Sequence, residues 1–234
     1  MAFHYGLKFT KDHQLKYISH LDILRLFQRA FKRADIGLRH SEGFNPHPKM
    51  SFAQPLSLGF TSEGEYLEFE TVAEWNGEDL IRTLNAVLPP GTEVTSCGRL
   101  PEVGRKSLAS LIEAADYEIT LEVPMGEMLA ERADLFMSQE AILVEKKRKK
   151  DKNPTMVDIK PMVVSLDAKE EDCILTMNVR LKTGSNANLN PELLVTAFLN
   201  FTNIPFRREN LQIRRKEMYY LEDEAYKPLL AYLA

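Results

Sequence analysis

The same order of strand-like and helix-like segments occurs twice along this chain. In each half, hydrophobic periodicity predicts a strand, a helix, further strands, a second helix and a final strand. In the first half these segments are residues 4–18, 20–35, 50–60, 65–73, 78–88 and 92–99. In the second half they are residues 116–123, 125–138, 142–147 with 157–167, 173–182, 191–201 and 211–219, and a short helix is predicted at 224–233.

This order is the order of the split βαβ, or ferredoxin-like, unit. Its repetition predicts an α+β protein with two tandem ferredoxin-like domains. We expect the first domain at residues 1–103 and the second at 104–234, joined near a linker that contains Pro101 and Gly104. One continuous α+β domain is the alternative, and 234 residues are enough for either arrangement.

The first predicted helix carries apolar residues at three- and four-residue spacing, from Leu21 through Phe27 to Ala34. Ser19 is placed to cap its N-terminus, and Asp22 lies where a carboxylate favours a helix start. Gly37 follows the apolar pattern, so the helix is expected to stop there.

A basic face runs along the same helix. Arg25, Arg29, Lys32 and Arg33 lie at i, i+4, i+7 and i+8, which places them on one side of the helix. Four like charges on one face repel each other unless a bound anion neutralises them. The alternative is an ordinary solvated face of an amphipathic helix.

A loop dense in special residues follows this helix. Gly43 permits unusual backbone dihedrals, while Pro46 and Pro48 stiffen the peptide. The loop displays an aromatic ring, an amide, imidazoles and an ammonium group next to the arginine face, and these groups suit single-stranded RNA or a flipped base. The groups expected to contact RNA here are Arg39, His40, Phe44, Asn45, His47 and Lys49. Alternatively, Phe44 fills the core and the prolines form an ordinary turn.

A second basic stretch has six positive charges in seven residues, from Lys146 to Lys152. It is expected to form a turn between strands that contacts phosphates, or else a simple solvated loop. The predicted phosphate contacts are Lys146, Lys147, Arg148, Lys149 and Lys150. Five more cations are expected on this surface, at residues 207–208 and 214–216.

Charge and cysteine content exclude several classes of protein. The net charge of −4 means that any nucleic-acid binding must come from local patches. The two cysteines, Cys97 and Cys173, are far apart and form no cluster motif, so a structural zinc site and an iron–sulfur cluster are not expected. We expect no metal and no other cofactor. Free thiols, with no signal peptide or membrane span in the sequence, predict a cytoplasmic protein.

The histidines allow one catalytic alternative. Metal-independent RNA cleavage needs an acid and a base, and histidine serves both near neutral pH. His20, His40 and His47 are the candidates, with Lys49 or Arg39 to stabilise the charged transition state. A structural role for His20 at the start of its helix is the competing explanation.

Residues 19–66, SHLDILRLFQRAFKRADIGLRHSEGFNPHPKMSFAQPLSLGFTSEGEY, resemble the signature of the radical SAM-linked protein family. Weaker matches are Asp158-Ile159-Lys160-Pro161 and the segment 184–191. Members are small bacterial proteins of unknown function, fused behind a radical SAM enzyme or separate from it. The resemblance implies association with radical SAM chemistry connected with RNA or the ribosome. Without a CxxxCxxC motif, this chain is not expected to be the radical enzyme itself.

These observations lead to one expectation and two alternatives. We expect a non-catalytic RNA-binding or substrate-presenting partner of a radical SAM enzyme that is supplied in trans. The first alternative is a protein–protein adaptor that docks on this enzyme without touching RNA. The second is a metal-independent endoribonuclease, because paired ferredoxin-like folds resemble the RNA-processing endoribonucleases of CRISPR systems in architecture.

Overall fold

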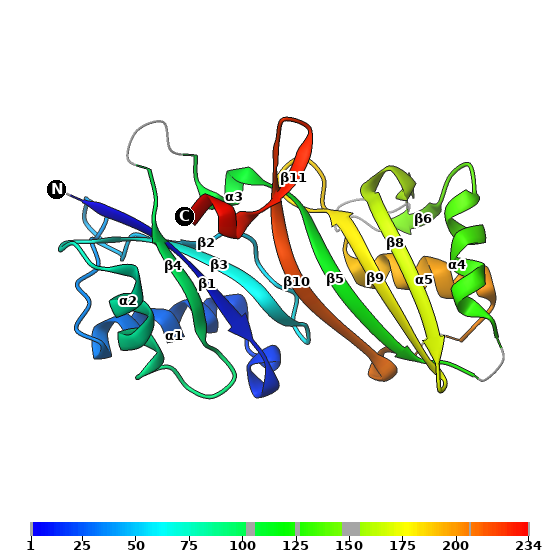
Figure 1. Ribbon diagram of the computed structural model, residues 1–234, viewed down its shortest axis with the longest axis horizontal. Coiled ribbons are helices and arrows are strands. Elements are labelled where there is room, and N and C mark those ends of the chain that lie inside the picture. The colour runs from blue at the N-terminus through cyan, green and yellow to red at the C-terminus, as the bar shows by residue number, and fades with distance from the viewer. Residues whose placement is uncertain (1, 102–105, 125–126, 147–154, 206, 234) are drawn as a thin grey trace. The chain divides into compact units, whose positions relative to one another are not determined.

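The computed structural model describes residues 2–101, 106–124, 127–146, 155–205 and 207–233 of the chain (Figure 1). The fold is mixed α+β, and it divides into two compact units. The first unit is Met1–Glu113 together with Arg215–Ala234, and the second is Ala114–Arg214. This division differs from the expected boundary after residue 103, because the last twenty residues return to the first unit.

The first unit is built around antiparallel strands. Its elements are β1 (Phe3–Lys11), α1 (His20–Arg33), β2 (Met50–Phe52), β3 (Thr61–Thr71), α2 (Gly77–Asn85), β4 (Val94–Arg99), α3 (Leu108–Leu111), the part of β10 (Leu211–Glu222) from Arg215 onward, and β11 (Ala225–Pro228). β1 pairs with both β3 and β4, and β2 pairs with β3. In the register, Leu7 lies opposite Leu67 on one side and Cys97 on the other.

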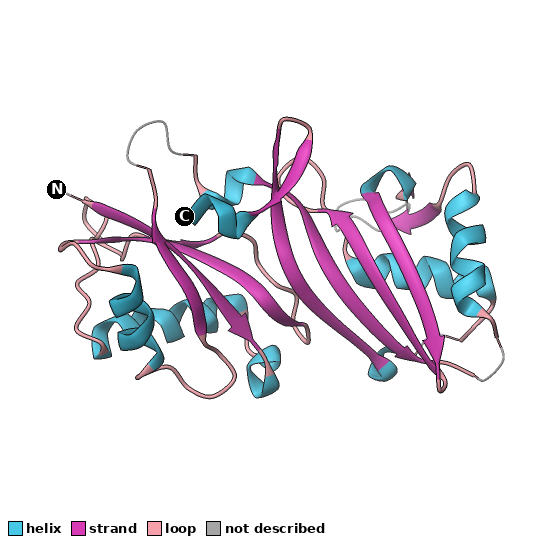
Figure 2. Cartoon of the chain, viewed as in Figure 1, coloured by secondary structure: helices cyan, strands magenta, loops and turns pink. Residues whose placement is uncertain are grey.

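The core of the first unit lies between these strands and two helices. In Figure 2 α1 and α2 lie on one side of β1, β3 and β4, and residues from all of these elements form one buried cluster. Aromatic rings connect α1 to the sheet, with centroids 4.7 Å apart for Phe9 and Phe27 and again for Phe31 and Phe69. This packing fixes the orientation of α1, so its basic face is turned away from the core.

The N-terminus of α1 forms as expected, but its C-terminus does not. The Ser19 side chain accepts the backbone N–H of Asp22 at 3.2 Å, which confirms the N-cap. The helix ends at Arg33, and Asp35 takes the left-handed conformation with φ 54°. The Ile36 N–H then closes the helix on the Phe31 carbonyl at 3.0 Å. The expected stop at Gly37 is therefore wrong, because Asp35 occupies the position that glycine usually takes.

The second unit contains antiparallel strands and a separate two-stranded hairpin. Its elements are the part of β5 (Ile112–Glu122) from Ala114 onward, α4 (Leu129–Ser138), β6 (Leu143–Lys146), β7 (Thr155–Asp158), β8 (Val163–Glu171), β9 (Ile174–Lys182), α5 (Pro191–Thr202) and the part of β10 before Arg215. β9 pairs with β5 and β8, while β6 pairs with β7. Along β9, Leu175, Met177, Val179 and Leu181 are buried in strict alternation. Phe136 of α4 meets Phe198 of α5 with ring centroids 5.4 Å apart.

Several predicted elements differ from the observed ones, and of the strand expected at 50–60 only β2 (Met50–Phe52) forms. The strand expected at 4–18 ends at Lys11, and a 3₁₀ turn capped by the Asp12 side chain follows it. The strand expected at 157–167 is interrupted by a turn that contains Pro161, because proline cannot donate to a sheet ladder. The helix expected at 224–233 is β11 followed by a 3₁₀ turn, since Asp223 and Glu224 both take positive φ and form a tight hairpin with β10.

Candidate nucleic-acid interface

The basic face of α1 is exposed along its length. Arg25, Arg29, Lys32 and Arg33 are all exposed to solvent. Arg25 pairs with Asp22 at 3.1 Å, and Arg33 donates to the backbone oxygen of Val87 at 2.5 Å. Arg29 and Lys32 have side chains that make no hydrogen bond or ion pair with any described residue.

Three of these cations line one cavity, which we call the arginine groove. Its volume is about 360 Å³, and it is lined by Asp22, Arg25, Leu26, Arg29, Arg33 and Pro89. Three guanidinium groups face one carboxylate in this space. The groove therefore has an excess of positive charge and fixed donors that suit a phosphate oxygen.

The loop after α1 forms a short hairpin, residues 39–49, that is anchored on β3. The Ser41 N–H donates to the His47 carbonyl, and the Lys49 N–H donates to the Arg39 carbonyl, both at 2.8 Å. The Arg39 backbone N–H donates to the Glu70 carbonyl at 2.8 Å, and the Glu70 N–H donates to the Lys49 carbonyl at 3.1 Å. The ion pair between Lys49 and Glu70, at 3.2 Å, adds to this anchor. The hairpin base is thus held by backbone hydrogen bonds.

The tip of this hairpin projects into solvent. Gly43 has φ 118°, a conformation that favours glycine. Phe44 is fully exposed, with a relative accessibility of 112%, and Asn45 is also exposed. The alternative in which Phe44 fills the core is therefore wrong.

A hydrogen bond orients one of the two hairpin histidines. Ser41 Oγ lies 2.9 Å from His47 Nδ1 and also accepts the backbone N–H of His47 at 3.1 Å. In the tautomer in which Oγ–H donates to Nδ1, the ring proton is on Nε2. His47 in this tautomer presents an N–H donor to solvent.

A second cavity, which we call the α1–hairpin pocket, is also lined by Arg29. Its volume is about 550 Å³. Its lining residues come from the C-terminal half of α1 and from both ends of the hairpin: Gln28, Arg29, Phe31, Lys32, Asp35, Ile36, Gly37, Leu38, His40 and Pro48. Arg29 lines both cavities, so the pocket and the arginine groove are neighbours.

The three candidate histidines do not share a cavity among those found. His20 packs its ring against Phe52 at 5.0 Å and lines a small cavity of about 20 Å³ with Lys11 and Glu65. His40 lines the α1–hairpin pocket instead. Burial, and then the charge of Lys11, lower the pKa of His20. His20 therefore has a packing contact with Phe52 at the start of α1 and shares no cavity with His40.

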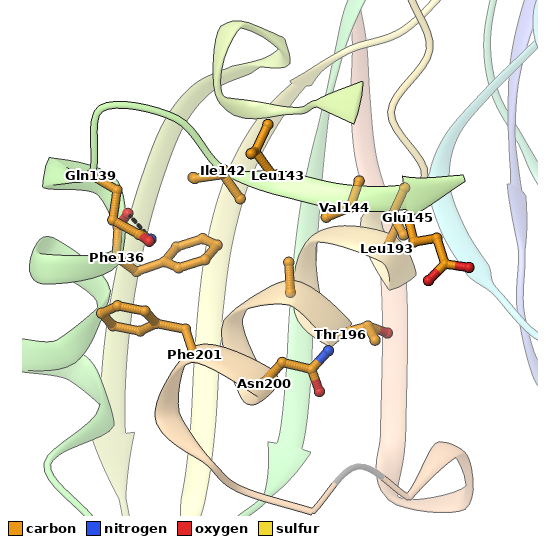
Figure 3. Close-up of a pocket in the computed structure, with 11 residues that line it drawn as sticks. Phe136, Gln139, Ile142, Leu143, Val144, Glu145, Leu193, Thr196, Asn200 and Phe201 are labelled. Atoms are coloured by element: carbon orange, nitrogen blue, oxygen red, sulfur yellow. Dashed lines mark hydrogen bonds between the residues drawn. The ribbon is translucent and has the colours of Figure 1, made fainter. Parts of the chain in front are cut away.

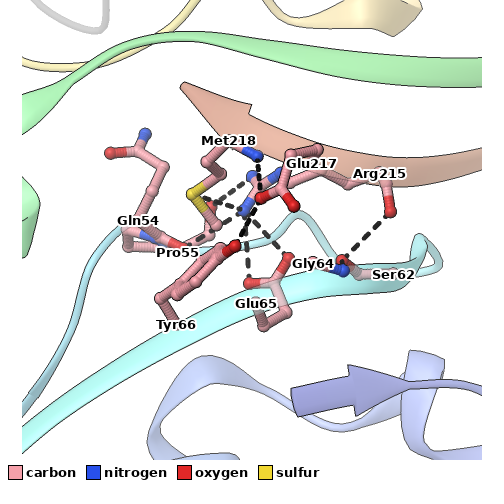
Figure 4. Close-up of polar contacts among 9 residues, drawn as sticks. All are labelled: Gln54, Pro55, Ser62, Gly64, Glu65, Tyr66, Arg215, Glu217 and Met218. Atoms are coloured by element: carbon pink, nitrogen blue, oxygen red, sulfur yellow. Dashed lines mark hydrogen bonds and ion pairs between the residues drawn. The ribbon is translucent and has the colours of Figure 1, made fainter. Parts of the chain in front are cut away.

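A buried polar network that joins β3 to β10 was not predicted from the sequence (Figure 4). Arg215 on β10 is only 3% exposed, and it pairs with Glu65 on β3 at 3.0 Å. It also donates to the backbone oxygens of Gln54 and Pro55. Assigning Arg215 to the outer basic surface is therefore wrong, because its guanidinium points into the first unit.

The sequence did contain a signal for this burial. Leu211, Ile213 and Arg215 alternate along β10, and the first two are buried. A residue two positions after two inward apolar residues points to the same face of a strand. Its neighbour Lys216 points the other way and pairs with Glu63 at 2.8 Å.

The second basic stretch is only partly described. Lys147, Arg148, Lys149 and Lys150 lie outside the described residues, and Lys146 ends β6. Arg208 pairs with Glu192 at 2.5 Å. Asp158, from the weaker sequence match, accepts the backbone N–H groups of Ile142 and Lys160 and thereby closes the β6–β7 hairpin.

A further cavity lies in the second unit between β6 and helices α4 and α5 (Figure 3). Its volume is about 740 Å³, and Phe136, Leu143 and Phe201 contribute apolar walls. The Gln139 side chain donates to the backbone oxygen of Phe136, and the Thr196 hydroxyl donates to the backbone oxygen of Glu192. None of the described residues predicted to bind RNA lines this cavity.

Residues 4–191 match a family described as an uncharacterized protein conserved in bacteria (DUF2344). The chain belongs to this family. The matched region contains α1 and the whole hairpin, and it ends before β10. This family description does not mention radical SAM enzymes or RNA.

No curated protein matches the chain. Among solved structures, a chain in the crystal structure of a Cbf5-Nop10-Gar1 complex is similar with 11% identity and a TM-score of 0.49. The similarity covers 94% of this chain and 50% of that one, so this chain spans about half its length. An unknown protein from Galdieria sulphuraria is similar with 12% identity, a TM-score of 0.27, and coverage of 92% and 99%. At these TM-scores neither likeness supports an argument about fold or function.

Two further properties of the DUF2344 chain concern its described residues only. No group of three His, Cys, Asp or Glu side chains in the described ranges is placed to hold a metal ion. Over the same ranges, no helix is long and apolar enough to cross a membrane.

Proposed function

We propose that this protein is a non-catalytic RNA-binding or substrate-presenting partner of a radical SAM enzyme supplied in trans. The observation that supports RNA binding best is the arginine groove, where Arg25, Arg29 and Arg33 line one cavity. The enzyme partner rests on the resemblance of residues 19–66 to the radical SAM-linked family. In this proposal the protein acts in the cytoplasm, where thiols such as those of Cys97 and Cys173 stay reduced.

In this proposal the arginine groove binds phosphates and the hairpin binds a base. The three arginines would hold phosphate oxygens of a single strand, which is independent of sequence. Phe44 would stack on a base, because its ring is fully exposed at the end of an anchored stem. His47 would donate through Nε2. Lys146 and the basic residues after it would add phosphate contacts from the second unit.

Titration of a short single-stranded RNA with paired variants tests this function. The double variant Arg25→Gln/Arg29→Gln should weaken binding about tenfold or more at low salt, since each hydrogen bond between charged groups contributes roughly 1.5–3 kcal/mol. Arg82→Gln is the matched control, because Arg82 is an exposed helical arginine of α2 whose side chain pairs with Asp79. Equal affinities for the double variant and the control would count against the groove.

An adaptor function is the second candidate, and exposed apolar side chains favour it. Besides Phe44, the residues Tyr17, Leu21 and Leu58 are each about 60% exposed in the first unit. Such side chains are typical anchors of protein interfaces. Pull-down of the enzyme with Phe44→Ala and Arg29→Glu separates the two functions. If these variants lose RNA and retain the enzyme, the adaptor explanation fails.

For the fold, we propose the tandem ferredoxin-like arrangement. The antiparallel pairing of β1 with β3 and β4, and of β2 with β3, supports it in the first unit. The pairing of β9 with β5 and β8 supports it in the second, with β6–β7 as an inserted hairpin. The likeness to CRISPR endoribonucleases stays an analogy of architecture, and it predicts no cleavage.

A further inference from the structure

The α1–hairpin pocket has apolar walls that could contact a flat ring. Phe31 and Ile36, which are almost completely buried, contribute to one part of it, and Leu38 and Pro48 contribute to another. Its volume of about 550 Å³ lies within the usual range for small-ligand sites. Apolar walls of this kind accept a base that is turned out of a single strand.

The polar side chains of this pocket carry both signs of charge. Arg29 and Lys32 offer donors from α1, and Asp35 offers a carboxylate at the end of the same helix. In the part of the chain that the structure describes, no residue forms a hydrogen bond or ion pair with any of these three side chains. The pocket therefore presents two cations and one anion whose bonding capacity is open to a ligand.

Asp35 is an unfavourable residue for its position. Its φ of 54° is a conformation that glycine adopts at lower energy. A carboxylate also interacts unfavourably with the negative end of the helix dipole. Neither the fold of α1 nor its cap needs this side chain, because the closing hydrogen bonds come from backbone groups.

We propose that the α1–hairpin pocket binds guanine in preference to the other RNA bases. This inference rests on the proposed RNA-binding function. Guanine has two adjacent N–H donors on its Watson–Crick edge, and the Asp35 carboxylate accepts both. Arg29 or Lys32 donates to guanine O6 or N7, the usual partners of these side chains. Cytosine, uracil and adenine each lack the adjacent pair of donors that a carboxylate needs.

Arg29 connects this base site to the phosphate site. It lines both the pocket and the arginine groove, so a nucleotide whose base enters the pocket has its phosphates beside Arg25 and Arg33. One guanidinium with five donors can serve a base oxygen and a phosphate oxygen at once. Binding is then expected to combine general affinity for a strand with preference for one base.

The test uses four fluorescent oligonucleotides with the full chain. Each is an oligouridine strand whose central base is guanine, adenine, cytosine or uracil. The wild type should bind the guanine strand roughly five- to a hundredfold more tightly than the others, the range for one good bidentate contact. Asp35→Asn should lose this preference and keep its affinity for the all-uridine strand. Glu78→Gln, which removes an exposed carboxylate from α2, should retain the preference.

The outcomes separate this inference from the function on which it rests. Equal, salt-sensitive binding of all four strands would overturn the guanine site and leave the RNA-binding function standing. An unchanged guanine preference in Asp35→Asn would also overturn it. If no strand binds at low salt, both proposals fail. The comparison of four strands by the wild type does not depend on the folding of any variant.

Discussion

At the scale of single residues, burial decides whether a charged side chain forms an ion pair inside the protein or remains available to a ligand. Arg215 and Lys216 are adjacent cations, but Arg215 is paired inside the first unit and Lys216 is partly exposed. Composition counts them as equal, and only the alternation of Leu211 and Ile213 along β10 separates them. Arg29 is the opposite case, because its position on a helical face correctly predicted its exposure.

Removing Arg215 should therefore destabilise the protein strongly. Arg215→Met leaves Glu65 as a buried carboxylate without its partner, which should lower the free energy of unfolding by about 3 kcal/mol. Lys216→Met breaks only the exposed pair with Glu63 and should lower it by less than about 1 kcal/mol. Urea unfolding followed by circular dichroism measures both. Similar losses in the two variants would mean that the buried pair contributes no more than the exposed one.

His20 should make stability depend on pH in the acidic range. Burial and Lys11 lower its pKa in the folded protein below the unfolded value of about 6.5. Between these two pKa values the unfolded chain binds more protons, so the free energy of unfolding falls as the pH falls through that window. The effect should stay below about 1 kcal/mol, because solvent screens a partly exposed ring.

The matched comparison is His20→Gln, which keeps a polar side chain but does not titrate. Unfolding curves at about pH 5 and about pH 8 should show a smaller pH dependence for this variant than for the wild type. A wild type and a variant with identical pH dependence would show that His20 has no lowered pKa.

At the scale of elements, α1 and the hairpin form the candidate site together. The sequence predicted the N-cap, the apolar stripe and the basic face of α1, because each follows from local spacing. It could not predict the two cavities, since these depend on how the hairpin folds back onto Glu70 of β3 and on where Pro89 lies. The buried position of Arg215 likewise depends on a strand that pairs with residues 150 positions earlier.

At the end of α1, we expect the Asp35 side chain to lower the stability of the protein and to strengthen the binding of guanine. Asp35→Gly should raise the free energy of unfolding by up to about 1 kcal/mol, because glycine adopts the left-handed conformation without strain and removes a carboxylate from the helix C-terminus. The same change should weaken binding of a guanine-containing strand. Thermal unfolding and the oligonucleotide titration measure the two effects. A variant that is less stable than the wild type would show that the Asp35 side chain supports the fold.

At the scale of the whole molecule, the net charge of −4 conceals local basic surfaces. The repeated element order correctly predicted an α+β fold, but it did not predict that residues 215–234 return to the first unit. That return depends on long-range pairing, such as Tyr66 of β3 donating to Glu217 of β10 at 2.6 Å. Overall charge therefore says little about function here, and the distribution of arginines says more.

The salt dependence of RNA binding tests the central claim most directly. Each phosphate contact to a single strand contributes a slope of roughly −0.7 in log K against log salt, so three arginines predict about −2 for the groove. Arg25→Gln and Arg29→Gln should each reduce the magnitude of the measured slope by roughly 0.7, while Arg82→Gln should leave it unchanged. Absence of binding at low salt, or one slope shared by all of these proteins, would contradict RNA binding through the arginine groove.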